Sequence, residues 1–119
     1  MRFLIHVTCG EENPTRAALG LLVAKSAVDE GHDVDVFLAG DGAGLARTSA
    51  AAATNGIGTG NAGEWLAYLA EHNVPLYVSG MSAQARGMDA ESLKADGFIP
   101  SPPTKLVALA AEADRVLVY

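Results

Sequence analysis

The sequence predicts an α/β fold with three layers, α/β/α, built around an open and mainly parallel sheet of about five strands. Short apolar segments rich in Val, Leu and Ile alternate along the chain with segments that carry helix capping signals. Strands joined by helical crossovers run parallel, and a parallel sheet needs helices on both faces. With 119 residues and no internal repeat, we expect a single domain over residues 1–119.

The strands are predicted from short apolar and β-branched segments. The first, Arg2–Thr8, is apolar on both faces, as expected of a strand that is covered on two sides. The second, Asp33–Ala39, begins with alternating polar and apolar residues and ends in a continuous apolar run. Three more strands are expected at Pro75–Ser79, at Phe98 with Ile99, and at Arg115–Tyr119.

The helices are predicted from their capping residues. Asn13 followed by Pro14 starts an Ala/Leu-rich helix that runs to about Glu30 and stops at Gly31. The other helices are expected at 61–72, at 89–96, and from Ser101 with Pro102 onward. Between the second strand and the helix at 61–72, the segment Gly40–Gly63 holds more than half of the 13 glycines and a short Ala run. We expect this segment to be a mobile connection or lid with one or two helical turns.

Charge and composition exclude several classes of function. The formal net charge is −6, and the eight Lys and Arg residues are scattered singly. Because a phosphate backbone requires a basic stripe, we expect no nucleic-acid partner. Lys25 and Asp29 interrupt the most hydrophobic helix, so we also expect no membrane span and no membrane partner. One cysteine rules out an internal disulfide and agrees with a reducing cytosol, so we expect a cytoplasmic protein.

The sequence offers neither a metal site nor a cofactor-binding motif. His6 and Cys9 are three residues apart in an extended segment, so their side chains would point to opposite faces. The glycine strings Gly40–Gly44 and Gly56–Gly63 lack the spacing and position of a dinucleotide fingerprint, and no Walker lysine follows them. We therefore expect no metal and no cofactor.

The candidate site lies beyond the carboxyl ends of the strands, where an open parallel sheet binds its ligands. Cys9, Gly42 and the segment Ser79–Ser82 all follow strands and would meet at this edge. A helix after Cys9 would favour the thiolate, whereas Glu11 and Glu12 would oppose its negative charge. Cys9 is therefore read either as a nucleophile or as a small half-buried residue without chemistry.

Four other side chains have two interpretations each. His6 is either a core histidine or a ligand contact. Asp33 and Asp35, about 7 Å apart on one strand face, are either a solvated end of the strand or an acid/base pair. Arg86 either holds an anion at the strand-end edge or is solvated.

Four segments in register resemble the DsrE/DsrF-like family of sulfur-relay proteins over essentially the full length. They are the opening MRFLIHVT, EGHDVDVFLAGDG at 30–42, VPLYVSGMSAQARG at 74–87 and LVALAAEADRVLVY at 106–119. The resemblance implies that sulfur-carrying members hold a persulfide on a cysteine at the end of the third strand. Ser79 occupies that position, and a serine hydroxyl cannot hold a persulfide. Cys9 does not match the sulfur-carrying position, although it is the only thiol.

The resemblance also implies a homo-oligomer, trimer or hexamer, or a hetero-oligomer with related subunits. Trp65, Tyr68 and Tyr77 are candidate contact residues, and core packing is their alternative use. The leading hypothesis is a binding or accessory subunit that lost the persulfide site. It would hold a small anion or a sulfur-containing ligand with candidate residues Gly42, Ser79, Gly80, Met81, Ser82 and Arg86. The alternatives are a sulfurtransferase that uses Cys9 as its catalytic thiol, and an oligomeric scaffold without a ligand.

Overall fold

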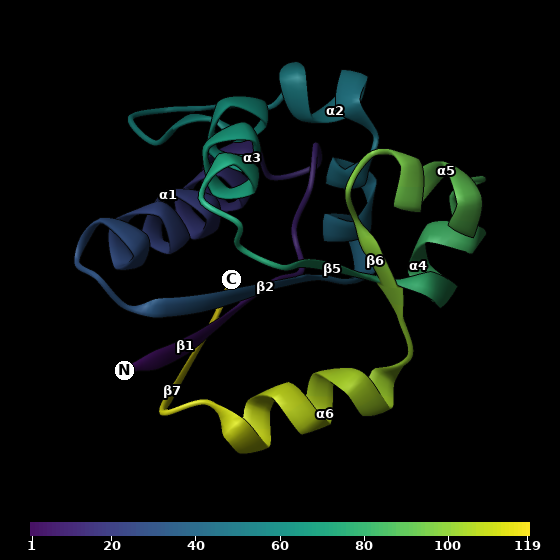
Figure 1. The fold of residues 1–119 in the computed structure, drawn as a ribbon. Coiled ribbons are helices and arrows are strands. Elements are labelled where there is room, and N and C mark those ends of the chain that lie inside the picture. The colour runs from purple at the N-terminus through teal and green to yellow at the C-terminus, as the bar shows by residue number, and fades with distance from the viewer.

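The sheet has five strands, all parallel, in the order β6-β5-β2-β1-β7 (Figure 1). The computed structural model describes all of residues 1–119. The strands are β1 (Arg2–Val7), β2 (Asp33–Leu38), β5 (Leu76–Ser79), β6 (Ile99–Ser101) and β7 (Arg115–Val118). The predicted α/β class and open parallel sheet are confirmed, and the strand boundaries agree with those expected from the sequence to within about two residues.

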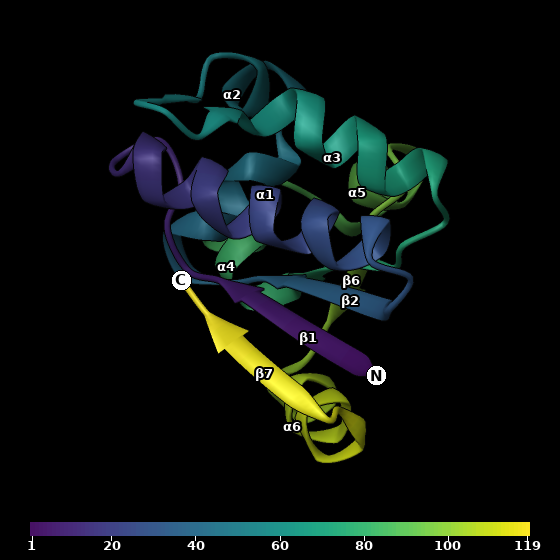
Figure 2. The same ribbon diagram turned by 90° about the vertical axis from the view of Figure 1, so that its left-hand side faces the viewer.

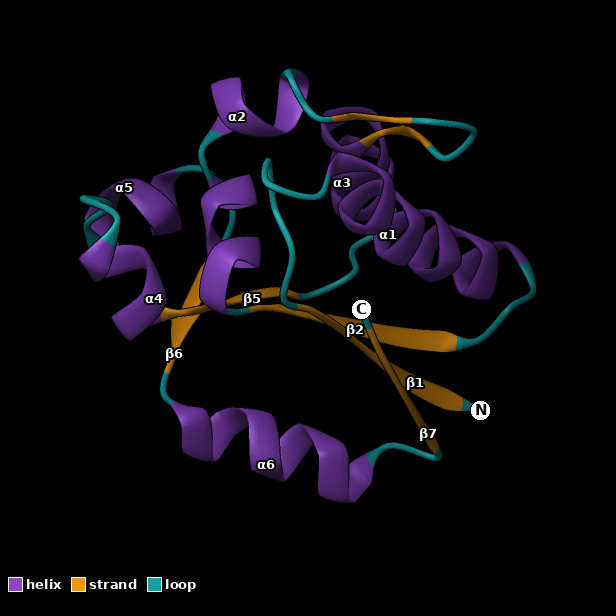
Figure 3. Ribbon diagram, turned by 180° about the vertical axis from the view of Figure 1, so that it is seen from behind, coloured by secondary structure: helices purple, strands orange, loops and turns teal.

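Helices cover the two faces of the sheet unequally. On one face lie α1 (Pro14–Asp29) and α3 (Ala62–Glu71), and on the other lies α6 (Pro103–Glu112) alone (Figures 2 and 3). The β5-to-β6 crossover is made of two six-residue helices, α4 (Gly80–Ala85) and α5 (Ala90–Ala95). None of the helices is both long enough and apolar enough to cross a lipid bilayer.

The predicted helix starts are formed by side-chain caps. The Asn13 side chain accepts a hydrogen bond from the Arg16 N–H at the start of α1, and Asn61 accepts one from the Glu64 N–H, 3.0 Å away, at the start of α3. Each cap satisfies an N–H group that has no partner within the helix. The helix α4 was not predicted, because its six residues GMSAQA are too few to show a helical period.

Strand β1 divides the core into two parts. Leu4 and Ile5 are both fully buried, and they point to opposite faces of the sheet. Ile5 belongs to the large hydrophobic cluster beneath α1 and α3. Leu4 belongs to a small cluster with Phe37 and Leu109, which fastens α6 to the second face.

The segment Gly40–Gly63 forms more regular structure than the sequence indicated, and the expected helical turns are present in it. It contains the 3₁₀ helix η1 (Gly40–Ala46), the helix α2 (Thr48–Ala52), and a hairpin of β3 (Asn55–Gly56) and β4 (Gly60–Asn61). Leu45 and most of the alanines of this segment up to Ala51 are buried against the large cluster. The extent of this packing was not predicted because small residues can pack closely as well as give freedom to a loop, and composition does not separate the two uses.

His6 lies on the face that α6 covers, beside Phe37. The two rings meet edge to face at 5.9 Å, and the Nε2 atom of His6 is buried without a hydrogen-bond partner. Burial lowers the pKa of His6 below its usual value of 6.5, because the imidazolium would lose its hydration. The interpretation of His6 as a core histidine therefore agrees with its position.

We expect His6 to make the fold less stable in mild acid. Because its pKa is lower in the folded state, the unfolded chain binds more protons as the pH falls below about 6.5, and the free energy of unfolding decreases there. The loss is complete once the pH is below the folded pKa. His6→Leu is expected to remove this decrease, and His72→Gln, which removes an exposed imidazole, is expected to keep it. Urea unfolding at a series of pH values measures the free energy of unfolding of both variants. An unchanged decrease in His6→Leu would contradict the assignment of this decrease to His6.

Candidate functional site

The parallel register brings the carboxyl ends of the strands to one edge, as the sequence predicted. Val7 is paired with Leu38, and Leu38 with Val78. Ser79 is paired with Ser101 at the end of β6. The turns that follow β1, β2 and β5 therefore lie next to one another, which is the arrangement in which open parallel sheets bind ligands.

Ser79 caps the helix that follows it. Its Oγ accepts a hydrogen bond from the Ser82 N–H at 3.2 Å, which makes it the N-cap of α4. The Oγ of Ser82 in turn accepts a hydrogen bond from the Gly40 N–H at 3.0 Å. The two serines thus connect the turn after β5 to the turn after β2, and both hydroxyl oxygens have structural roles.

Arg86 is held by partners within the chain. Its guanidinium lies 2.7 Å from an Asp41 carboxylate oxygen and donates to the Ser82 carbonyl at 2.9 Å. Arg47 donates to the backbone carbonyl of Arg86 at 2.8 Å. These contacts fix the end of α4 against η1.

A polar cavity of about 250 Å³ adjoins this group. Its charged lining residues are Glu11, Glu12, Asp41, Arg47 and Arg86. Three carboxylates therefore face two guanidinium groups, and one of the guanidinium groups is already paired. An anion entering this cavity would meet a net negative lining and would have to compete with Asp41 for Arg86.

Gly80 and Met81 line a larger cavity of about 630 Å³ just beyond Ser79. It lies between α4, the start of α5 and the turn from β6 to α6, and Met88 and the prolines at 100, 102 and 103 also contribute to it. Met81 is 71% exposed. This cavity is the most spacious one at the strand-end edge. Its lining combines the methionines and prolines with three polar residues, Gln84, Asp89 and Ser101.

Cys9 and Ser79 do not face a common cavity. Cys9 is half-buried and packs against the large cluster on the α1 side. Ser79 lies two residues after Tyr77, which packs against the small cluster on the α6 side. Neither residue lines any of the five cavities of the molecule.

Gly42 is required by close packing of the backbone. A Cβ atom at this position would lie 2.3 Å from the carbonyl oxygen of Val7, and no side chain fits there. Gly42 is buried in η1 and lines none of the cavities. The close contact between η1 and the end of β1 therefore accounts for a glycine at this position.

Sequence reasoning missed three residues of this edge: Asp41, Arg47 and Met88. Asp41 is 45 residues from its partner Arg86, and no spacing in the sequence indicates such a pair. One feature of the sequence could have indicated the pair: Asp41 lies in the turn after the second strand, and Arg86 lies in the segment after the third. Placing both turns at one edge would have made an ion pair between them a reasonable expectation.

The fold and the site together define a class of protein. A parallel five-stranded sheet between helices, with the turns that follow its strands gathered at one edge, is an open-sheet α/β domain. The family model of the DsrE/DsrF-like family matches residues 1–119. The chain belongs to this family, which confirms the resemblance seen in the sequence.

A solved structure agrees with the fold. The crystal structure of the YchN protein from E. coli is similar, with a TM-score of 0.64 and 17% sequence identity over 99% of this chain and 97% of that chain. At this identity the likeness shows the fold alone. No curated protein matches the sequence.

Proposed function

We propose that this chain is a binding or accessory member of the DsrE/DsrF-like family that does not itself carry sulfur. The observation that supports this most directly is Ser79, which lies at the end of β5, where the resemblance implies the persulfide cysteine. Its hydroxyl oxygen caps α4, and a hydroxyl is both a weak nucleophile at neutral pH and unable to form a persulfide. A serine serves the cap well, because serine is among the preferred N-cap residues.

The position of Cys9 supports the same proposal. A replacement carrier would need its sulfur in an open cavity that a donor protein or a small persulfide reaches. Cys9 instead packs against the large cluster, on the opposite side of the sheet from the face toward which Ser79 is directed. Gly10 follows it, and the Gly10 N–H donates a hydrogen bond to the Glu12 carboxylate, which holds the turn after Cys9.

We propose further that the ligand occupies the cavity beside Gly80 and Met81. Thioether sulfur is polarizable and adapts to irregular, soft ligands. Because the neighbouring polar cavity has a net negative lining, a sulfur-containing molecule suits this edge better than a small anion. The proposed location of the protein is the cytoplasm, where its single thiol would stay reduced.

Persulfide transfer to defined variants tests the loss of the carrier site. When a thiolate attacks the outer sulfur of a small persulfide, a Cys–S–SH group forms and the donor leaves as a thiol. We expect intact mass spectrometry to show one added sulfur atom on Cys9→Ala/Ser79→Cys, and none on Cys9→Ala or on the wild type. A sulfur atom gained by the wild type and absent from Cys9→Ala would favour the sulfurtransferase that uses Cys9. Failure of the Ser79→Cys variant to gain sulfur would contradict the assignment of position 79.

A thermal shift assay tests the ligand cavity. A ligand that binds only the folded state raises its melting temperature. We expect reduced glutathione to raise the melting temperature of the wild type, and we expect sulfate to leave it unchanged. Ala90→Leu fills the cavity from α5 and is expected to lose the shift, while Ala95→Leu, on the same helix but outside every cavity, keeps it. Equal shifts in both variants would place the ligand elsewhere, and no shift with the wild type would favour a scaffold without a ligand.

We also propose that copies of the chain, or related subunits, assemble through β7. The aromatic residues expected to form contacts already have partners within the chain: Trp65 donates to the Thr59 carbonyl at 2.8 Å, Tyr68 to Asp29, and Tyr77 stacks on Phe37. By contrast, Val116 and Val118 on the edge strand β7 are 42% and 55% exposed. An edge strand that carries exposed valines is suited to pairing with another chain.

Native mass spectrometry tests this assembly. We expect the wild type to form a trimer or hexamer, and Val116→Thr/Val118→Thr, which keeps the shape of the side chains, to shift the population toward monomer. Ile57→Thr serves as the control, since Ile57 is 89% exposed on the turn between β3 and β4. A monomeric wild type at micromolar concentration, or an equal effect of the control, would contradict an interface at β7.

A further inference from the structure

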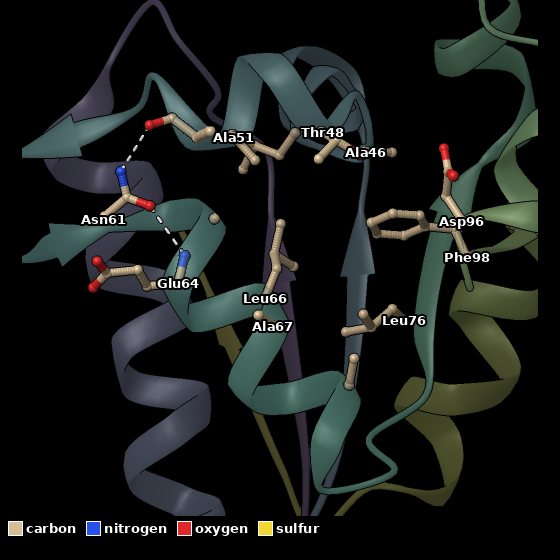
Figure 4. A pocket seen from close by; sticks show the side chains of 14 residues that line it. Ala46, Thr48, Ala51, Asn61, Glu64, Leu66, Ala67, Leu76, Asp96 and Phe98 are labelled. Carbon is tan, nitrogen blue, oxygen red and sulfur yellow. Dashed lines mark hydrogen bonds between the residues drawn. The ribbon is translucent and has the colours of Figure 1, made fainter.

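A third cavity, of about 450 Å³, lies on the face that α1 and α3 cover, between α3, α2 and the start of β6 (Figure 4). It shares no lining residue with the cavity beside Met81 or with the polar cavity beside Arg86. Its apolar lining includes Leu45, Leu66, Leu76 and Phe98, and each of these is 9% exposed or less. Figure 4 shows Leu66 and Phe98 on opposite sides of the space.

Short side chains keep this space open. Ala51 from α2 and Ala67 and Ala70 from α3 form much of its wall. The alanine content of the two wall helices thus leaves room for the cavity.

The charged groups of this cavity are both acidic. Glu64 and Asp96 line it from exposed positions, and neither carboxylate takes part in an ion pair or accepts a hydrogen bond from the protein. The lining contains no Lys, Arg or His. The Asn61 side chain, also in the lining, accepts from the Glu64 N–H and donates to the Ala52 carbonyl at 2.9 Å, so it is engaged in the fold.

We propose that this cavity binds a small organic cation, a protonated amine attached to a compact apolar body of one or two rings. The volume falls in the range of roughly 300–1,000 Å³ that is typical of small-molecule sites, and the lining is mainly apolar with few polar groups, as in such sites. The apolar body would contact Leu66 and Phe98. The ammonium group would lie toward Glu64 or Asp96, whose charges have no counterion in the chain and would repel an anion.

This proposal stands apart from the proposed function, because the two cavities have no residue in common. A failure of glutathione to bind beside Met81 leaves the amine site unaffected, and the reverse also holds. The two sites are separated in one experiment by observing which backbone amides respond to each compound.

Three probes with the same phenyl body and different charge test the proposal: 2-phenylethylamine, 2-phenylethanol and 3-phenylpropanoate. We expect the amine to shift the backbone amide NMR signals of Ala51, Leu66 and Phe98, and to bind more tightly than the alcohol. The carboxylate is expected to bind most weakly. The proposal would be overturned if the carboxylate bound as tightly as the amine or more tightly. It would also be overturned if only amide signals outside the cavity shifted, or if none of the three compounds bound.

Variants with matched controls separate the apolar contribution from the charge. Ala67→Leu occupies the cavity from an exposed position of α3 and keeps a strong helix former, so we expect it to abolish binding; Ala111→Leu on α6 is its control. Glu64→Gln and Asp96→Asn are each expected to weaken amine binding by roughly two- to five-fold and to leave the alcohol unchanged. Glu71→Gln, an exposed carboxylate on α3 outside the cavity, is expected to have no effect. Undiminished amine binding in Ala67→Leu, or in the Glu64→Gln/Asp96→Asn double variant, would overturn the site.

Discussion

The parallel pairing of β1 with both β2 and β7 is the constraint on which the rest of the structure depends. This strand lies inside the sheet and is buried on both of its faces, with Leu4 directed toward α6 and Ile5 toward α1. Because its neighbours run in the same direction, every crossover must return the chain to the same starting edge. All the turns that follow strands are consequently collected at the opposite edge, where Ser79, Arg86 and the strand-end cavities lie.

Much of the fold could be predicted from the sequence because it is encoded locally. Asn13 with Pro14, and Asn61 with Glu64, marked helix starts that the structure contains. The apolar segments marked all five strands of the main sheet. Where the encoding was short or ambiguous, prediction was incomplete: α4 has too few residues to show a period, and the alanines and glycines after β2 fit both a loop and a tightly packed connection. Chain order alone also leaves open which strand lies beside β1, and pairing with β7 requires contacts more than 100 residues apart.

The candidate site was predictable to the level of an edge, and the particular contacts at that edge were not. Topology placed Cys9, Gly42 and Ser79 near one another, since each follows a strand. It could not show that Cys9 packs against one side of the sheet while Ser79 is directed to the other, or that Asp41 pairs with Arg86. Those outcomes depend on side-chain direction and on partners distant in sequence. A glycine such as Gly42 is equally uninformative on its own, because a close approach to a neighbouring backbone and a close approach to a ligand demand the same residue.

The partnership of β1 with β7 has a consequence for how the chain acquires its structure during synthesis. Residues 1–101 contain four of the five strands and all the helices of one face, yet β1 has an unpaired edge until residues 115–118 have left the ribosome. An unpaired edge on an apolar strand is a site at which nascent chains associate wrongly. The hydrogen bonds from Asp114 to Arg2 and from Tyr119 to His6 close that edge along its length. Completion of the sheet therefore waits for residues 115–118, and a chain cut short within α6 would keep its central strand open to other molecules.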